Sequence, residues 1–335
     1  MLLATGLGGL AACLKPTDVK HVEVDTAVSP LLPDARISVS SRGKIKNLGY
    51  GCRQRVVVGN RRQQVIDIAV SQWRRFGYVV IDRSGRFRNQ SQGDLRGLVA
   101  RRIPALNEAP QHELIQSDEE AGSVNGAIAG YWSTVDPAPA AHGEPSPGSR
   151  LWHYNRQIIS ASSARWSEPW SAAFVSWVMC EAGADETDFP KASSHVEFLI
   201  ASEDLNKSRL GWYQSLLPKD AGSLNAGDIV CAARGNYSQD FLDGPVQNTM
   251  PAHCDIIVDI DPDHGLALAI GGNIRDKVAM SILSLERAGN GFVLAASSGT
   301  TVAMPWLRVL RMKAPAPGAS IGRSFRVLQF GGQSQ

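Results

Sequence analysis

The sequence predicts an α+β fold in which helices come first and an antiparallel sheet of five or six strands follows. Up to about residue 200, apolar residues recur at the three- and four-residue spacing of helices. After Leu216 the pattern changes to short apolar or alternating runs, separated by Gly, Asp and Pro at the spacing of hairpins. Because the two kinds of segment do not alternate along the chain, we do not expect a parallel α/β sheet.

Five helices are expected in the first part of the chain. The first begins at Arg61 and stops at Gly77, and the stretch GYVVIDRSG after it is typical of a short strand and a turn. Residues 136–150 carry four prolines and two glycines, which predicts a loop. The other four helices are expected over 120–132, 152–160, 171–180 and 193–201.

Six runs after Leu216 are the expected strands. Each is short, rich in Val, Ile, Leu and Ala, and bounded by turn residues. They are AGDIVCAAR, HCDIIVDID, GLALAIGGN, KVAMSILSL, GFVLAA and WLRVLRM.

The N-terminus resembles the lipobox of bacterial lipoproteins. MLLATGLGGLAAC is apolar from Leu2 to Ala12 and reaches Cys13 through small residues, although no Lys or Arg precedes the run. Eleven apolar residues are too few for a membrane-spanning helix, which needs about 20. The alternative is a frayed terminus with a chance cysteine. The expected organisation is a signal peptide and lipobox over 1–13, a tether over 14–60, one domain over 61–311 and a tail over 312–335.

Composition and charge exclude some classes of function. The chain has 335 residues, of which 43% are hydrophobic and 20% charged, and its formal net charge is +2. Without Lys/Arg runs it lacks the basic surface that nucleic-acid binding requires, so no nucleic-acid partner is expected. No Cys or His residues have the spacing of a zinc site, and we expect neither a metal nor an organic cofactor.

Four cysteines remain if Cys13 carries a lipid. An exported protein meets an oxidising compartment, in which disulfides form. Cys231 ends one expected strand and Cys254 begins the next, so a bond between them is geometrically reasonable if the two strands pair. Cys180 lies in an apolar helix and is expected to be a buried free thiol, and Cys52 is the fourth of these cysteines.

Three residues have the order of a nucleophile, a base and an orienting group. Ser171 begins a helix, where the dipole and the free N–H groups favour developing negative charge. His253 begins a strand and could accept the serine proton, and Asn273 follows the next strand and could orient the imidazole. Each also has a structural explanation: a helix cap for Ser171, a strand end for His253 and a turn for Gly-Gly-Asn.

In this order, the motifs WSAAFV, LNAGDIV, AHCDIIV and GGN resemble the CHAP and NlpC-type cell-wall amidases and endopeptidases. A closer resemblance is to the bacterial family known as domain of unknown function 2272, and it rests on the stretches EPWSAAFVSWVM, FPKASSHVEFLI, GDIVCAAR and HCDIIV. The resemblance covers about residues 61 to 311 and implies a papain-like NlpC/CHAP core with peptidoglycan peptides as substrate. It places Ser171, His253 and Asn273 at the positions of a Cys-His-Asn triad.

Ser171 departs from that pattern, because the cell-wall hydrolases use cysteine. A thiol readily yields a thiolate, whereas a serine must lose its proton as it attacks. The expected function is a peptidoglycan amidase or endopeptidase, lipid-anchored in the envelope and facing the periplasm, with the outer membrane preferred over the inner. The alternatives are a catalytically silent lipoprotein that binds cell wall or an envelope protein partner, and a serine esterase or acyltransferase.

Three further residues are candidates for the substrate cleft. Trp170 directly precedes Ser171 and is expected to form an aromatic wall. His195 either lines the cleft or lies at the surface. Asp255 shares a strand face with His253, where it either polarises that imidazole or caps the sheet edge, and Cys254 is expected to face away from the site.

Overall fold

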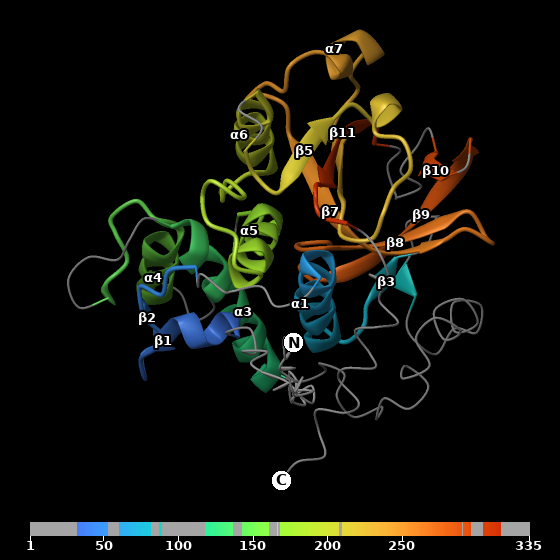
Figure 1. Cartoon of the computed structure of the whole chain (residues 1–335). Coiled ribbons are helices and arrows are strands. Elements are labelled where there is room, and N and C mark those ends of the chain that lie inside the picture. Colours follow the sequence, from blue (N-terminus) through green and yellow to red (C-terminus); the bar gives the residue numbers. More distant parts are fainter. Residues whose placement is uncertain are drawn as a thin grey trace, which may run out of the picture.

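The α+β class is confirmed in the computed structural model of the chain, in which helices pack on a large curled sheet (Figure 1). The structure describes residues 32–52, 60–81, 87–88, 118–136, 143–160, 166, 168–207, 210–289, 291–295 and 304–315. The expected lipobox with Cys13, and residues 316–335 of the expected tail, lie outside these ranges.

Each of the five expected helices is present. Asn60 caps the first of them by accepting hydrogen bonds from the backbone N–H groups of Arg62 and Gln63. None of the helices in the described part of the chain combines the length and apolar character needed to cross a membrane. The helices are α1 (Arg61–Arg75), α3 (Asp118–Val135), α4 (Arg150–Ser160), α5 (Ser171–Glu181), α6 (His195–Lys207) and the short α7 (Gln239–Asp243), with 3-10 turns η1 (Pro33–Arg36) and η4 (Pro218–Asp220).

The sheet is larger than expected and is mixed. Its strand order is β4-β3-β9-β8-β7-β6-β11-β5, with β10 paired to β9, and β3 runs parallel to β9. The six expected runs are all strands: β6 (Ile229–Ala233), β7 (Ala252–Asp261), β8 (Leu266–Gly271), β9 (Ala279–Ala288), β10 (Gly291–Leu294) and β11 (Trp306–Met312). The additional strands are β3 (Val80–Ile81), β4 (Phe87–Arg88) and β5 (Tyr213–Leu216), and of these only the stretch that forms β3 was expected to be a strand. Two to four residues are too few for a period to be recognised.

Residues 32–52 belong to the folded domain, which corrects the expected tether. They form η1 and a hairpin of β1 (Ile37–Val39) and β2 (Ile45–Asn47), with Ile37 and Ile45 buried. The side chain of Asn155 on α4 bonds both the N–H and the C=O of Ile45, at 2.8 and 2.7 Å. Apolar burial and this paired amide contact hold the hairpin against the helices.

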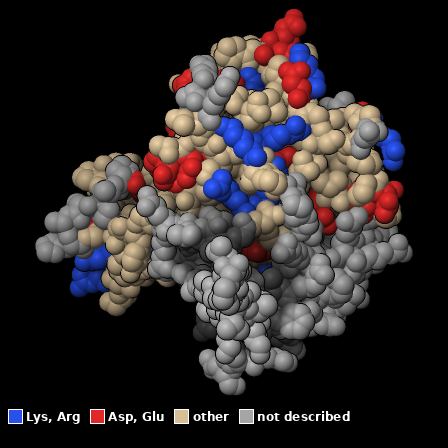
Figure 2. All heavy atoms as spheres, viewed as in Figure 1, with Lys and Arg blue, Asp and Glu red and all other residues tan. Residues whose placement is uncertain are grey.

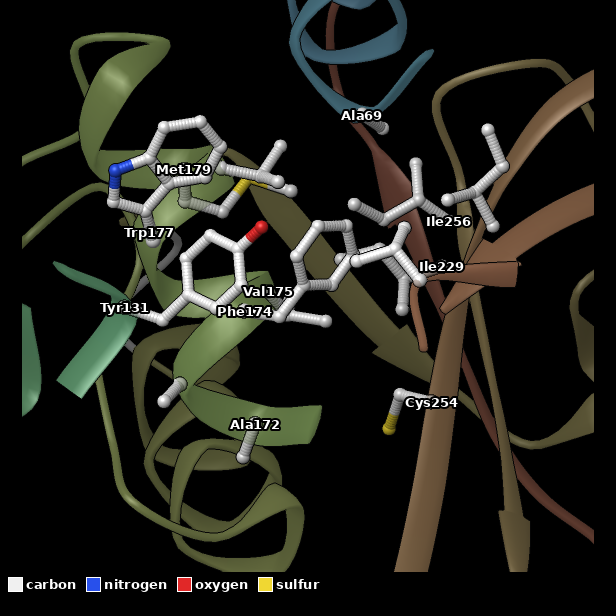
Figure 3. Close-up of a cluster of buried hydrophobic side chains, with 14 of the residues drawn as sticks. Ala69, Tyr131, Ala172, Phe174, Val175, Trp177, Met179, Ile229, Cys254 and Ile256 are labelled. Carbon is white, nitrogen blue, oxygen red and sulfur yellow. The ribbon is translucent and has the colours of Figure 1, made fainter. Parts of the chain in front are cut away.

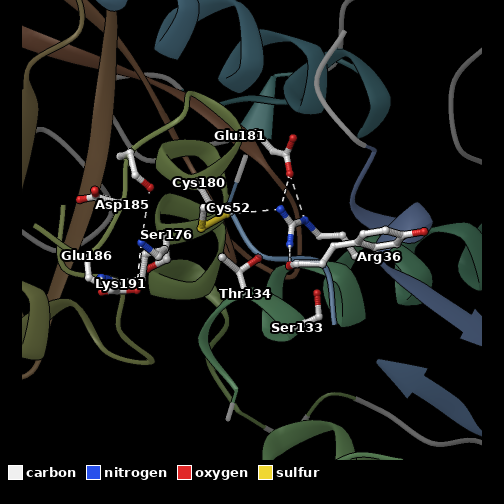
Figure 4. The surroundings of a disulfide bond; sticks show 12 residues. Arg36, Cys52, Ser133, Thr134, Ser176, Cys180, Glu181, Asp185, Glu186 and Lys191 are labelled. Carbon is white, nitrogen blue, oxygen red and sulfur yellow. Dashed lines mark hydrogen bonds and ion pairs between the residues drawn. A yellow bond between two sulfur atoms is a disulfide. The ribbon is translucent and has the colours of Figure 1, made fainter. Parts of the chain in front are cut away.

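Two disulfides join distant parts of the fold. The Cys231–Cys254 bond is present between directly paired residues of β6 and β7. Cys180 is bonded to Cys52 and is therefore not the free thiol that the sequence predicts (Figure 4). Beside this second bond, Arg36 forms an almost fully buried ion pair with Glu181 and also donates to the Cys180 sulfur at 3.3 Å. The N-terminal hairpin is thus fastened to the C-terminal end of α5.

The sheet has an apolar layer on each face. On one face Cys254, Ile256 and Ile229 pack against the α5 residues Ala172 and Phe174 (Figure 3). On the other, Ile257 packs with a second cluster formed largely by residues of the sheet itself. Burial on both faces explains why β6 reads as a continuous apolar run and not as an alternating one.

Candidate active site

The first residues of two helices, Ser171 of α5 and His195 of α6, form a hydrogen-bonded pair. The Ser171 hydroxyl lies 2.7 Å from His195 Nε2, and the two residues are only 3% and 4% exposed. His195 is therefore not a surface residue, and it takes the place beside Ser171 that the sequence assigned to His253. We call Ser171 and His195 the dyad.

The connection over 182–194 runs back past Ser176 of α5 and brings the two helix starts together. Gly183 ends α5 with φ +92°, a left-handed conformation that glycine adopts at low cost. The Ser176 hydroxyl accepts a hydrogen bond from Ala192 N–H at 3.1 Å and donates to the Ala192 carbonyl at 3.2 Å. These contacts fix the chain just before His195, so that its ring points back to the start of α5.

Burial controls the charge of His195. It lowers the pKa of this imidazole well below its ordinary value, and His253 and Arg234 lower it further. The ring is therefore neutral at pH 7, so Nε2 can accept the Ser171 proton if Nδ1 carries the ring hydrogen. Among the described residues, the buried Nδ1 atom has no hydrogen-bond partner. The dyad thus has a base without the carboxylate that orients the base in a triad.

His253 is held between two groups of opposite charge. Arg234 Nη2 lies 3.3 Å from Nδ1, and Asp255 Oδ1 lies 2.9 Å from Nε2. The second pair of atoms lacks the alignment of a hydrogen bond, so the contact is mainly electrostatic. An arginine can only donate, which assigns the ring hydrogen of a neutral His253 to Nε2, facing Asp255. Asp255 is thus placed beside His253, on an interior strand and not at the sheet edge.

Strand alternation puts His253 and Asp255 on the face of β7 opposite to α5. Cys254, between them, projects towards α5, although the sequence analysis expected it to face away from the site (Figure 3). The end of the neighbouring strand β8 shows the same two faces. A Cβ on Gly272 would meet Phe174 of α5, whereas one on Gly271 would overlap the Asp255 carboxylate. His253 still approaches the dyad at the start of its strand, where its ring lies edge-on to that of His195 with centroids 5.3 Å apart.

Asn273 is near His253 but is not bonded to it. It follows β8 with φ +56°, a left-handed conformation that asparagine tolerates, and it lines a pocket together with His253 and Asp255. No hydrogen bond joins Asn273 to His253 among the described residues. Ser171, His253 and Asn273 are therefore not assembled into one hydrogen-bonded triad.

Trp170 belongs to the core and does not line a cleft. It is 1% exposed and packs against Tyr131 and Phe76, with ring centroids 5.7 and 5.9 Å away. An aromatic residue next to a helix start is as compatible with packing between helices as with a substrate wall, and here the α3 and α1 residues decide the outcome.

Arg234, which faces His253, was not singled out in the sequence, where its only signal is a basic residue directly after the strand run IVCAA.

In the described ranges, no three His, Cys, Asp or Glu side chains gather as metal ligands would. On the face drawn in Figure 2, the described Lys and Arg side chains form small groups near Asp and Glu, without a continuous basic surface.

Comparison with known proteins adds a family. Residues 125–312, from within α3 to the end of β11, match the family model described as "Uncharacterized protein conserved in bacteria (DUF2272)". No curated protein and no solved structure matches the chain. The matched residues include the dyad, His253, Asp255 and Asn273, and they make up more than half of the chain. The protein is therefore a member of the bacterial DUF2272 family.

Proposed function

We propose that this protein hydrolyses amide bonds of peptidoglycan, with Ser171 as nucleophile and His195 as general base. The observation that carries the proposal is the 2.7 Å contact between the Ser171 hydroxyl and His195 Nε2 at the start of α5. Ser171 Oγ would bond to the carbonyl carbon while Nε2 takes its proton, and the resulting imidazolium would protonate the leaving amine. Water would then attack the acyl-serine while His195 accepts its proton, and that proton would return to Ser171 Oγ as the ester bond breaks and the acyl group leaves as a carboxylic acid.

The surroundings of the dyad suit this chemistry. His195 is unprotonated at neutral pH because burial lowers its pKa, so the base is ready to accept a proton. The first N–H groups of α5 have no acceptor within the helix, and they can donate hydrogen bonds to the carbonyl oxygen as negative charge develops on it. Both features support acyl transfer at Ser171.

Two further observations support the envelope and its polymer as the place of action. Two disulfides are typical of proteins in oxidising compartments, and the N-terminal run ending in Cys13 resembles a lipobox. We propose a lipid anchor at Cys13 that holds the domain on the periplasmic side of the outer membrane. The resemblance to NlpC and CHAP enzymes supports a papain-like core and a peptidoglycan peptide as substrate.

A second candidate is a catalytically silent wall-binding protein of the same fold. The 3% exposure of Ser171 favours it, because a nucleophile must meet its substrate. The Nδ1 atom of His195 favours it too, because no carboxylate among the described residues bonds to it and would stabilise the imidazolium.

Digestion of purified sacculi separates the two candidates, with released muropeptides identified by mass spectrometry. The protein from Leu14 onward is compared with Ser171→Ala, Ser171→Cys and His195→Gln. Ser202→Ala is the matched control, since it removes an equally buried hydroxyl from α6. The hydrolase requires products from wild type and control, and a loss of at least a hundredfold in Ser171→Ala and His195→Gln.

Products from Ser171→Cys alone would indicate a scaffold whose nucleophile has been silenced. Products that persist in Ser171→Ala would refute the assignment of the nucleophile. Silence of all variants, together with retained binding to sacculi, would establish the wall-binding candidate.

A further inference from the structure

A pocket of about 200 Å³ opens on the face of the sheet opposite to α5. Its polar lining includes Arg234, Arg275, His253, Asp255 and Asn273, and its apolar lining includes Val230 and Trp306. Neither Ser171 nor His195 lines it, so this cavity is separate from the dyad. We call it the His253 pocket.

The His253 pocket is lined by two arginines, Arg234 and Arg275, and by one carboxylate, Asp255, and the His253 imidazole lies between Arg234 and Asp255. Arg234 is exposed, and a guanidinium has five N–H donors, so its single bond to His253 leaves others for a ligand. On the other side, Asp255 is only 8% exposed, and its Oδ1 atom has no aligned hydrogen bond in the described residues. Oδ1 itself is closed to solvent beside His253 Nε2, so a ligand can reach only the exposed part of this carboxylate, which lines the pocket. A buried carboxylate without aligned donors is costly, and a ligand donor there would offset that cost.

These charges select the class of ligand. A simple cation at Asp255 would be repelled by Arg234 and Arg275, and a simple anion at the arginines would lie near the Asp255 carboxylate and supply it with no donor. A molecule that carries both charges satisfies both groups. The volume corresponds to about seven water molecules, which is the size of a small amino acid.

We propose that the His253 pocket binds an α-amino-acid head group, with its carboxylate at Arg234 and its ammonium at Asp255. The apolar wall formed with Val230 and Trp306 accommodates a short aliphatic side chain. The head group comes either from a free amino acid or from a larger peptide in which one carbon keeps both charges. This binding does not depend on Ser171 or on the proposed hydrolysis.

Isothermal titration calorimetry on the protein from Leu14 onward tests the proposal. Alanine, as L- and D-enantiomer, is compared with N-acetylalanine, which lacks the ammonium, and with alaninamide, which lacks the carboxylate. We expect alanine of at least one hand to bind, and each blocked derivative to bind at least tenfold more weakly. A γ-glutamyl dipeptide, which keeps both charges on one carbon, is compared with alanine to identify the source of the head group.

Two variants assign the contacts. Arg234→Gln should weaken alanine to the level of alaninamide, and Asp255→Asn should weaken it to the level of N-acetylalanine. Arg287→Gln, at an exposed arginine of β9, is the control and should bind as wild type does. Thermal melts establish that each variant is folded.

The proposal is overturned if blocked derivatives bind as well as alanine, or if neither alanine nor the γ-glutamyl dipeptide binds at 50 mM. It is also overturned if folded Arg234→Gln and Asp255→Asn both bind as wild type does. Because the titration measures no turnover, a failure here is distinct from a failure of the sacculus digestion.

Discussion

Loss of the Cys52–Cys180 disulfide should cost more stability than loss of Cys231–Cys254. The first bond closes a loop with a sequence separation of 128 residues and the second one of 23. The chain-entropy relation converts these loops to roughly 5 and 3.4 kcal/mol of unfolding free energy. The difference of about 1.5 kcal/mol arises because the longer loop has more conformational freedom to regain in the unfolded state.

The comparison is made with two double variants, Cys52→Ala/Cys180→Ala and Cys231→Ala/Cys254→Ala. Each deletes two sulfur atoms and introduces no new thiol, so the chemistry of the two changes is matched. Urea unfolding followed by tryptophan fluorescence gives the free energy and the slope for each variant and for wild type. Equal losses, or a larger loss in the Cys231/Cys254 variant, would refute the loop-entropy reasoning. The full loss in wild type on adding a reductant should approach the sum of the two.

Three other predictions concern the charge of His195 and the packing at the two ends of α5. Burial lowers the pKa of His195 in the folded state, so the imidazole of the unfolded chain takes up a proton first as the pH falls below about 6.5. The contribution of His195 to the free energy of unfolding is therefore complete above that pH and should decline below it by up to about 1.4 kcal/mol per pH unit. Urea titrations at several pH values measure this decline, and His195→Gln should make it shallower; an unchanged slope contradicts the assignment. Arg36→Met should destabilise by about 3–5 kcal/mol because it removes the buried guanidinium that faces the Glu181 carboxylate, and chemical denaturation that detects less than 1 kcal/mol would contradict this. Gly272→Ala should cost about 1–3 kcal/mol, because the new Cβ would lie 2.6 Å from the Phe174 Cβ; a melting temperature equal to that of wild type would show that α5 can move away from the sheet without cost.

Local sequence patterns were enough to predict most of the helices and strands. Helix α1 is long enough for its period to be recognised in the sequence, and the strands from β6 onward are bounded by clear turn residues. The hairpin over 37–47 was missed because its strands have three residues each and its stability comes from α4, through Asn155. Contacts of this kind have no sequence period.

The start of α5 at Ser171 and the alternation of His253, Cys254 and Asp255 along β7 were determined by the sequence itself, because both follow from local backbone geometry. The sequence did not determine which face of β7 packs against α5. Alternation defines two faces, and only packing decides which of them a helix covers. For the same reason, the tertiary structure alone decided that His195, 24 residues along the chain, becomes the partner of Ser171. It also joined Cys180 to Cys52 across 128 residues, a pairing that depends on where the hairpin docks against the helices.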